Sequence, residues 1–434
     1  MRDLVFMAIL AGLLPFAIWN PQFGVLAYVW VGLMNPHRFV WQLSNFPVAL
    51  TFALATLVAM ILRKRFGRFP VRTETVLILV WFCYTTITTF LAIGHEAWAQ
   101  WDKVSKILLM AIVAGMLLQS RKDLTRLVAV IAGSILFFAV KGGIFSILTR
   151  GNYLVYGPAG SFISDNNDLA LAELMVLPLL LYFIRQEKKG WRGLLLKGAF
   201  VLSIVGIVFS YSRGALVAFV GLTLLLAWRS RHRFRALALA LIAVSALVAF
   251  APKAWMERMH TIQTYQQDAS ALGRLNAWGF AWNLANSRPW GGGFRAFTPE
   301  TFQHYAPNPE DYHDAHSIYF QVLGEQGYPG LLIFLSILGA SLLRLQRIRG
   351  QTRGEPEWKW AHDLAEMLQC SLLAYAMAGA FLGLAYFDLY YYVIITGVLL
   401  HVVYLEERRR ALVPVPEPVR AGLPSARAAA PTPA

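Results

Sequence analysis

The sequence predicts an all-α polytopic membrane protein, and three observations support that fold class. Hydrophobic residues make up 57% of the 434 residues and charged residues only 15%, against about 25% charged in an average soluble protein. Many apolar runs approach the length of about 20 residues that a membrane-spanning helix needs. Short basic clusters separate these runs and carry most of the net charge of +15. The composition therefore excludes a water-soluble fold, and the basic excess indicates membrane orientation rather than a nucleic acid partner.

The first part of the chain predicts two short helices, over residues 4–19 and 23–34, broken at Asn20-Pro21. The start of the chain lacks a small-residue cleavage site and is expected to be retained. Keeping the cluster Arg63-Lys64-Arg65 on the inner side requires the two helices to cross the membrane once in total, as a broken or re-entrant segment.

Further crossings are predicted along the rest of the chain, and basic clusters follow every second one. This spacing satisfies the positive-inside rule with about twelve crossings and both chain ends on the cytoplasmic side. The expected crossings are residues 46–62, 76–93, 104–118, 127–148, 169–184, 194–209, 215–228, 236–250, 330–343, 364–387 and 389–404.

The predicted organisation has four parts. Residues 1–250 hold the first transmembrane helices, and residues 251–327 form a large outer loop region. This loop is rich in Trp, Tyr and Phe, and loops of this length are usually either functional or disordered, so we expect it to be ordered and to carry the catalytic residues. Residues 328–405 hold the C-terminal transmembrane helices, and the Pro/Ala-rich tail 406–434 is expected to be disordered in the cytoplasm.

Two arginines on the outer side predict an anion site. Arg213 lies in Ser210-Tyr211-Ser212-Arg213-Gly214, and Arg274 follows Gly273. The guanidinium fork matches phosphate oxygens, and the sequence shows no acidic cluster to match the two arginines. The alternative is that each arginine reaches the lipid headgroups. Lys103 and Lys106, near the outer end of a predicted helix, have the same two interpretations.

Two histidines in Tyr312-His313-Asp314-Ala315-His316 are the candidates for proton transfer. A histidine suits removal of a proton from a sugar hydroxyl, because its ordinary pKa is about 6.5. On a helix, His313 and His316 would share a face, and with Asp314 they could bind a metal. No third ligand stands at a suitable spacing, so we expect no metal and no cofactor. The remaining alternative is a structural hydrogen bond.

Other polar and aromatic residues are weaker candidates. The run from Asp165 to Asp168 could bind sugar hydroxyls, but capping of the following helix is the favoured interpretation. Trp278, Trp282, Trp290 and Phe294 could stack on sugar rings or form an interfacial aromatic belt. Gly291-Gly292-Gly293 follows no predicted strand and is therefore not a nucleotide-binding loop.

The chain resembles the O-antigen ligase and polymerase superfamily of bacterial envelopes from about Asn20 to Tyr404. The most specific match is His316-Ser317, nine residues, then Gly327-Tyr328-Pro329-Gly330, which is similar to the ligase signature. Arg213 and Arg274 match the two arginines of the family. Asn35-Pro36-His37-Arg38 and the run from Asp165 to Asp168 resemble features of the exosortase-associated O-glycosylation ligases.

The resemblance implies a GT-C-type glycosyltransferase of the bacterial inner membrane with its site on the periplasmic side. Such ligases transfer a glycan from undecaprenyl pyrophosphate to the lipid A-core oligosaccharide, with inversion and without a metal. By this resemblance His316 would be the base, with His313 assisting or replacing it. The donor pyrophosphate would be bound by Arg213, Arg274, Lys103 and Tyr211, and the glycan or acceptor by Trp278, Asn166, Asn167 and Arg288.

Three other functions remain open at this stage. Polymerases of the same superfamily join one lipid-linked repeat to another, and protein O-oligosaccharyltransferases modify serine or threonine. The signature favours a ligase over a polymerase. An exporter of lipid-linked sugars would also need outer arginines and many crossings, but it would not need a histidine in an outer loop.

Overall fold

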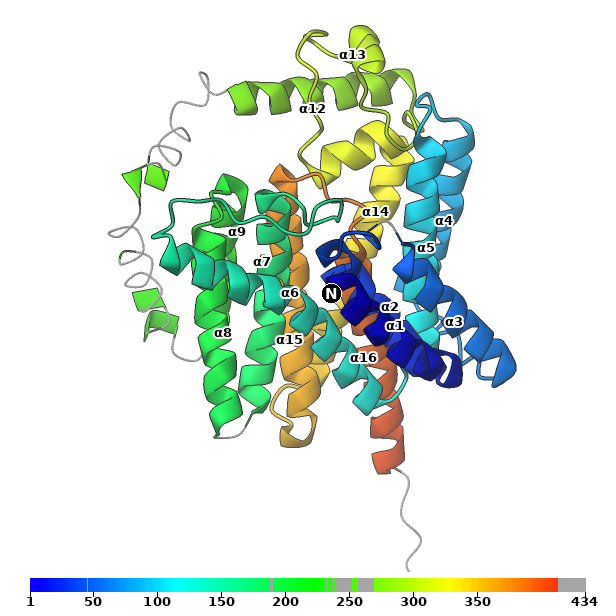
Figure 1. Cartoon of the computed structure of the whole chain (residues 1–434), viewed down its shortest axis with the longest axis vertical. Helices are drawn as coiled ribbons and strands as arrows, with labels where there is room; N and C mark the ends of the chain where they lie inside the picture. Colours follow the sequence, from blue (N-terminus) through cyan, green and yellow to red (C-terminus); the bar gives the residue numbers. More distant parts are fainter. Residues whose placement is uncertain are drawn as a thin grey trace, which may run out of the picture.

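The computed structural model describes residues 1–44, 46–187, 190–230 and 269–412, with short pieces between residues 233 and 256. Within these ranges the regular secondary structure is helical (Figure 1), which confirms the all-α class. Eight of the described helices are long and apolar enough to cross a membrane. The predicted crossing 236–250, the first part of the predicted outer loop and most of the C-terminal tail lie largely outside the described residues.

The N-terminal half of the chain forms helices close to the predicted crossings. The elements are α1 (Arg2–Trp19), α2 (Pro21–Met34), the short 3₁₀ helix η1 (Pro36–Phe39), α3 (Val48–Leu62), α4 (Thr73–Phe90), α5 (Ala97–Leu117), α6 (Arg121–Leu148) and α7 (Asn166–Gln186).

The second half continues the bundle and adds two helices across one end of it. The elements are α8 (Trp191–Val208), α9 (Arg213–Arg229), α12 (Ala269–Ser287), α13 (Pro299–Tyr305), α14 (Ile318–Gln351), η3 (Pro356–Trp358), α15 (Lys359–Ala378), η4 (Gly379–Phe381) and α16 (Asp388–Leu412).

The break between α1 and α2 confirms the two short helices that the sequence predicts. The Asn20 side chain accepts a hydrogen bond from the backbone N–H of Gln22 at 3.0 Å and so caps α2. Pro21 occupies the first turn of α2. Backbone N–H groups there have no acceptor within the helix, so the N–H that proline lacks costs no helical hydrogen bond. Both helices pack against α3.

The predicted crossing 364–387 is wrong at its C-terminal end. Helix α15 stops at Ala378, and residues 382–387 form a non-helical loop before α16. The Tyr375 hydroxyl donates to the Leu384 carbonyl at 2.9 Å, and the Ala385 N–H donates to Gln321 Oε1 at 3.2 Å. Neighbouring side chains thus satisfy the loop's polar backbone, which allows irregular structure inside a membrane protein.

The basic clusters gather at the end of the bundle opposite α12. Arg344 pairs with Glu74, Arg185 pairs with Glu366, and Arg121 stacks over the Trp360 ring at 4.3 Å. These contacts join α4 to α14, α7 to α15 and α6 to α15 at this end. Helix α12 crosses the other end of the bundle, with α13 above it (Figure 1).

Candidate active site

A cavity of about 590 Å³ lies at the end of the bundle that α12 crosses, opposite the basic clusters. Its walls come from the first turns of α5 and α7, the residue before α7, the N-terminal part of α14 and the loop after η4. The remaining lining residues are Arg295, Phe297, Tyr312 and Asp314 to His316. Chain segments that are far apart in sequence therefore build one site, and His316 is part of its lining.

His316 stands in the short link before α14, with its backbone in the left-handed region at φ 41°. The loop 382–387 lies next to His316: a Cβ added at Gly383 would lie 3.7 Å from the backbone nitrogen of His316. Burial lowers the pKa of His316, and the positive charge of Arg274 lowers it further. The negative charges of Asp314 and Asp165 raise the pKa of His316, but they do not outweigh burial and Arg274. At neutral pH the imidazole is therefore uncharged and able to accept a proton.

Helix α12 fixes the link that carries His316. The Trp278 indole N–H donates to the Ala315 carbonyl at 2.8 Å, and its ring stacks on Phe320 with 4.7 Å between centroids. The Asn276 side chain donates to the carbonyls of Asn308 and Asp311, both at 2.8 Å. These part-buried hydrogen bonds satisfy the loop's backbone carbonyls, as a regular element would otherwise do, so α12 holds the His316 backbone in place.

The expectation that His313 and His316 would share a helix face is wrong, because residues 312–316 are not helical. His313 packs its ring directly over Gly273, where an added Cβ would lie 2.7 Å from the ring atoms. Its Nδ1 lies 3.1 Å from the Asp311 carboxylate. His313 does not line the cavity, whereas His316 does. Among the described residues, no group of three or more His, Cys, Asp or Glu side chains is arranged to hold a metal.

The two predicted arginines lie at the same end of the bundle as the cavity. Arg274, on α12, is close enough to His316 for its charge to act on the imidazole. Arg213 is the first residue of α9, and the Ser212 hydroxyl caps that helix by accepting from the Ala215 N–H at 3.2 Å. Next to Arg213, Gly214 packs on Phe381, where an added Cβ would meet the Phe381 side chain at 2.8 Å. The residue after Arg213 therefore contacts η4, which directly precedes the cavity-lining residues Leu382 and Gly383.

The cavity itself contains a cluster of acidic residues that the sequence did not reveal. Four carboxylates line it, from Asp165, Asp168, Asp314 and Glu325. The expectation that no acidic cluster matches the arginines is therefore wrong. These residues come from three separate parts of the chain, so only the tertiary structure brings them together.

Arg295 is the arginine that lines the cavity, and sequence reasoning missed it. Its backbone is left-handed at φ 54°, and its N–H donates to Glu325 Oε1 at 2.9 Å. Its Nη1 lies 2.6 Å from Glu96 Oε2 in an exposed ion pair. Glu325 was the available signal, because a carboxylate inside an otherwise apolar helix usually has a functional reason and a partner.

The glycines of the ligase-like signature shape the start of α14. Gly327 has φ 65° and ψ −167°, which interrupts the helix. The Gly292 and Gly293 N–H groups donate to the carbonyls of Gly324 and Glu325 at 2.9 and 2.7 Å. The glycine triplet therefore docks on the break in α14.

The predicted helix cap before α7 is confirmed, because Asp165 accepts from the Asn167 N–H at 2.8 Å. The Asn167 side chain also donates to Asp165, at 2.7 Å. Asn166 donates to the Ser210 carbonyl at 2.6 Å and so ties α7 to the turn before α9. These contacts give both asparagines structural partners, and their glycan-binding role stays a prediction.

Three other predicted binding residues also contact the protein itself. The Tyr211 hydroxyl donates to the Gly151 carbonyl at 2.8 Å, and Arg288 donates to the Leu91 carbonyl at 2.7 Å. The Lys103 ammonium lies over the Phe162 ring at 3.4 Å. Their roles in binding donor or glycan stay predictions.

The N-terminal part of the chain adds a further cation beside the cavity walls. Arg38, in η1, places its guanidinium carbon 3.2 Å from where a Cβ on Gly160 would stand, in the loop that leads to Asp165. Its charge acts on Lys103, as does the charge of Arg295. Arg38, Lys103 and Arg295, which come from separate segments of the chain, thus lie near one another.

Two family models match the chain. Residues 198–335 match the family described as O-Antigen ligase, and residues 1–188 match a family of unknown function. The first match includes Arg213, Arg274, His316 and both signature glycines. No curated protein matches the chain. The resemblance to O-antigen ligases that the sequence suggested is thereby confirmed over residues 198–335, which are similar to that family.

Proposed function

We propose that the protein transfers a glycan from undecaprenyl pyrophosphate to a hydroxyl of lipid A-core oligosaccharide. The observation that carries the proposal is His316, an imidazole favoured in its neutral form, at the wall of a polar cavity within the segment that matches the O-antigen ligase family. The bundle would be of the GT-C type.

The reaction consists of one displacement at the anomeric carbon of the donor sugar. The bond from that carbon to the pyrophosphate oxygen breaks, and the bond to the acceptor oxygen forms on the opposite face. The acceptor proton passes to His316, and the electron pair leaves with undecaprenyl pyrophosphate. Direct displacement inverts the anomeric configuration.

His316 meets the requirement for the base in this step. A general base must be unprotonated at working pH and within reach of the acceptor hydroxyl. Burial and Arg274 favour the neutral form, and the link held by Trp278 fixes its backbone. The His313 ring packs on Gly273 and does not line the cavity, which supports His316 rather than His313 as the base.

The cations around the cavity would bind the pyrophosphate and stabilise the charge that grows as it leaves. Arg213, Arg274 and Lys103 stay the proposed ligands, with Tyr211 beside them, and Arg295 joins them because it lines the cavity. Positively charged groups that are fixed before the reaction need no reorganisation during bond cleavage, so they lower the barrier directly.

The four carboxylates would bind sugar rather than phosphate. An ionised carboxylate accepts hydrogen bonds from hydroxyl groups, whereas it repels a pyrophosphate. We therefore assign the acidic wall of Asp165, Asp168, Asp314 and Glu325 to the glycan or the acceptor. Trp278, Asn166, Asn167 and Arg288 stay in the proposed glycan-binding set.

The basic clusters at the opposite end support a cytoplasmic location for that end and a periplasmic location for the cavity, by the positive-inside rule. The proposed location is the bacterial inner membrane, where the donor lipid and the lipid A-core are both present.

The experiment mixes purified protein with undecaprenyl pyrophosphate-linked glycan and rough lipopolysaccharide. We expect a ladder of modified lipopolysaccharide without ATP, at the same rate with and without EDTA. Matched reactions contain a lipid-linked repeat or a serine-containing peptide as acceptor. Transfer to one of these alone would instead establish a polymerase or a protein oligosaccharyltransferase. Movement of the donor across liposomes without transfer to any acceptor would show an exporter.

A further inference from the structure

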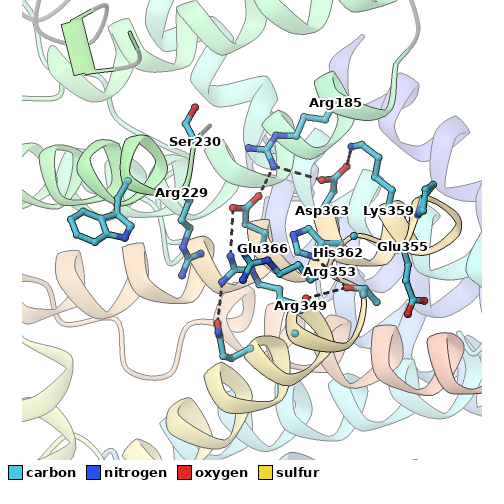
Figure 2. A pocket seen from close by; sticks show the side chains of 16 residues that line it. Arg185, Arg229, Ser230, Arg349, Arg353, Glu355, Lys359, His362, Asp363 and Glu366 are labelled. Atoms are coloured by element: carbon cyan, nitrogen blue, oxygen red, sulfur yellow. Dashed lines mark hydrogen bonds and ion pairs between the residues drawn. The ribbon is translucent and has the colours of Figure 1, made fainter. Parts of the chain in front are cut away.

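A second, larger cavity lies at the opposite end of the bundle, among the basic clusters. Its volume is about 930 Å³, and residues of α7, α9, α14 and α15 line it (Figure 2). Four arginines belong to its lining: Arg185, Arg229, Arg349 and Arg353. The proposed transfer reaction uses none of them.

Ion pairs neutralise one side of this cavity. Arg185 Nη1 lies 2.5 Å from Glu366 Oε2, and Lys359 pairs with Asp363 (Figure 2). Glu366 and Asp363 are thus already bonded to cations. They offer little further neutralisation to the remaining arginines.

The other side of the cavity holds an excess of positive charge. Arg229 and Arg349 both donate to the same neutral acceptor, Gln369 Oε1, at 2.8 and 2.9 Å. The closest carboxylate to Arg349 is Glu366 at 3.8 Å, and the Nε of Arg349 is buried without a hydrogen-bond partner. Arg353 forms no ion pair within the described residues. Two guanidinium groups that share one amide oxygen repel each other unless an anion lies between them.

The position of this cavity identifies the kind of anion. It lies at the ends of apolar helices, and at its wall the Trp228 side chain is 78% exposed. Exposed tryptophan at the end of a spanning helix is typical of the headgroup level of a bilayer. Basic pockets between transmembrane helices on the cytoplasmic side bind anionic lipid headgroups.

We propose that this cavity binds the phosphate headgroup of an anionic phospholipid from the adjacent leaflet. Arg229, Arg349 and Arg353 would donate to the phosphate oxygens, with the bidentate geometry that guanidinium and phosphate share. The lipid chains would lie against the apolar surfaces of the surrounding helices. The site would tie α9 to α14 and α15 at this end, independently of the transfer reaction.

Native mass spectrometry of the full chain, released from detergent with added lipid, tests the proposal. The probes are phosphatidylglycerol, phosphatidylcholine and inorganic phosphate at equal concentration. We expect wild type to retain phosphatidylglycerol in preference to both others. Arg229→Gln and Arg353→Gln are each expected to weaken its retention about ten-fold, because each removes one charged hydrogen bond to phosphate. Because Arg353 is exposed, its replacement is not expected to disturb folding, so this variant tests lipid binding alone.

Arg192→Gln is the matched control, since it removes one exposed charge from the first turn of α8 outside the cavity. We expect it to retain phosphatidylglycerol as wild type does. Equal retention by wild type and both cavity variants would overturn the proposal. Phosphatidylcholine bound as tightly as phosphatidylglycerol would do the same. Inorganic phosphate bound as tightly as phosphatidylglycerol would overturn the lipid assignment in favour of a free phosphate site.

Discussion

Gly327 packs its backbone so closely against Pro289 that a Cβ at residue 327 would lie 2.0 Å from the Pro289 carbonyl oxygen. Nearby, Gly291 would meet the Gly327 nitrogen at 2.5 Å if it carried a Cβ. This contact between two glycine-containing turns fixes the break inside α14. It therefore helps to position the part of α14 before the break, which His316 precedes by two residues.

Gly327→Ala should destabilise the protein and lower its activity. Alanine at φ 65° is strained by about 1–2 kcal/mol, and the clash with Pro289 adds about 1–3 kcal/mol of overpacking. Thermal unfolding monitored by size-exclusion chromatography measures the loss. Gly339→Ala is the control, because it lies in the same helix with no atom within 4 Å of an added Cβ. An equal effect of both substitutions would contradict the proposed role of the close contact.

His316→Ala should reduce the transfer rate about 10²–10⁴-fold, the usual contribution of a general base. His313→Ala should reduce it much less, because His313 does not line the cavity. Rates with lipid-linked donor and rough lipopolysaccharide measure both. His304→Ala, at an exposed position of α13, should leave the rate unchanged. If His313→Ala caused the larger loss, the base would be His313.

The pH profile should show a single loss of rate at acidic pH, as His316 becomes protonated. Because burial and Arg274 lower the pKa of His316, the rate should persist below pH 6.5 and fall only as the pH drops through the lowered pKa. Arg274→Gln removes one cause of the lowering, so the acid limb should move upward by about one pH unit. Arg126→Gln removes a charge that is paired with Asp123 at the opposite end and should not move it. An acid limb that is identical in wild type and Arg274→Gln would argue against this coupling.

Trp278→Phe should lower kcat while leaving the KM for donor unchanged. The phenyl ring can still stack on Phe320, but the hydrogen bond to the Ala315 carbonyl is lost, which destabilises the link by about 0.5–1.5 kcal/mol. Trp282→Phe, one turn along α12 and 53% exposed, serves as the control. A raised KM with unchanged kcat in Trp278→Phe would contradict the proposed role of this hydrogen bond in positioning the link.

Arg295→Gln should raise the KM for the lipid-linked donor about ten-fold or more, the effect expected for one charged hydrogen bond. Glu96→Gln breaks the same exposed ion pair but keeps the cation in the cavity. Because exposed ion pairs contribute little free energy, Glu96→Gln should change the KM less than two-fold. Equal changes in both variants would show that the ion pair, not the cation, matters for donor binding.

The chain's own pattern was sufficient to predict the helices and the residues of the ligase-like signature. Apolar runs with basic ends predicted most helices to within a few residues, including the break at Asn20. Motif spacing identified His316 and Gly327. These features depend on neighbouring residues, so local sequence contains the information.

Only the tertiary structure decided which groups meet. The acidic wall joins Asp165 and Asp168 to Asp314 and Glu325, residues about 150 positions apart. His313 packs on Gly273 of α12, whereas His316 lines the cavity, and their spacing in the chain reveals neither placement. Residues 382–387 leave the helix because Tyr375 and Gln321 bond their backbone. Such outcomes follow from contacts between distant segments, which hydrophobic periodicity and motif spacing do not encode.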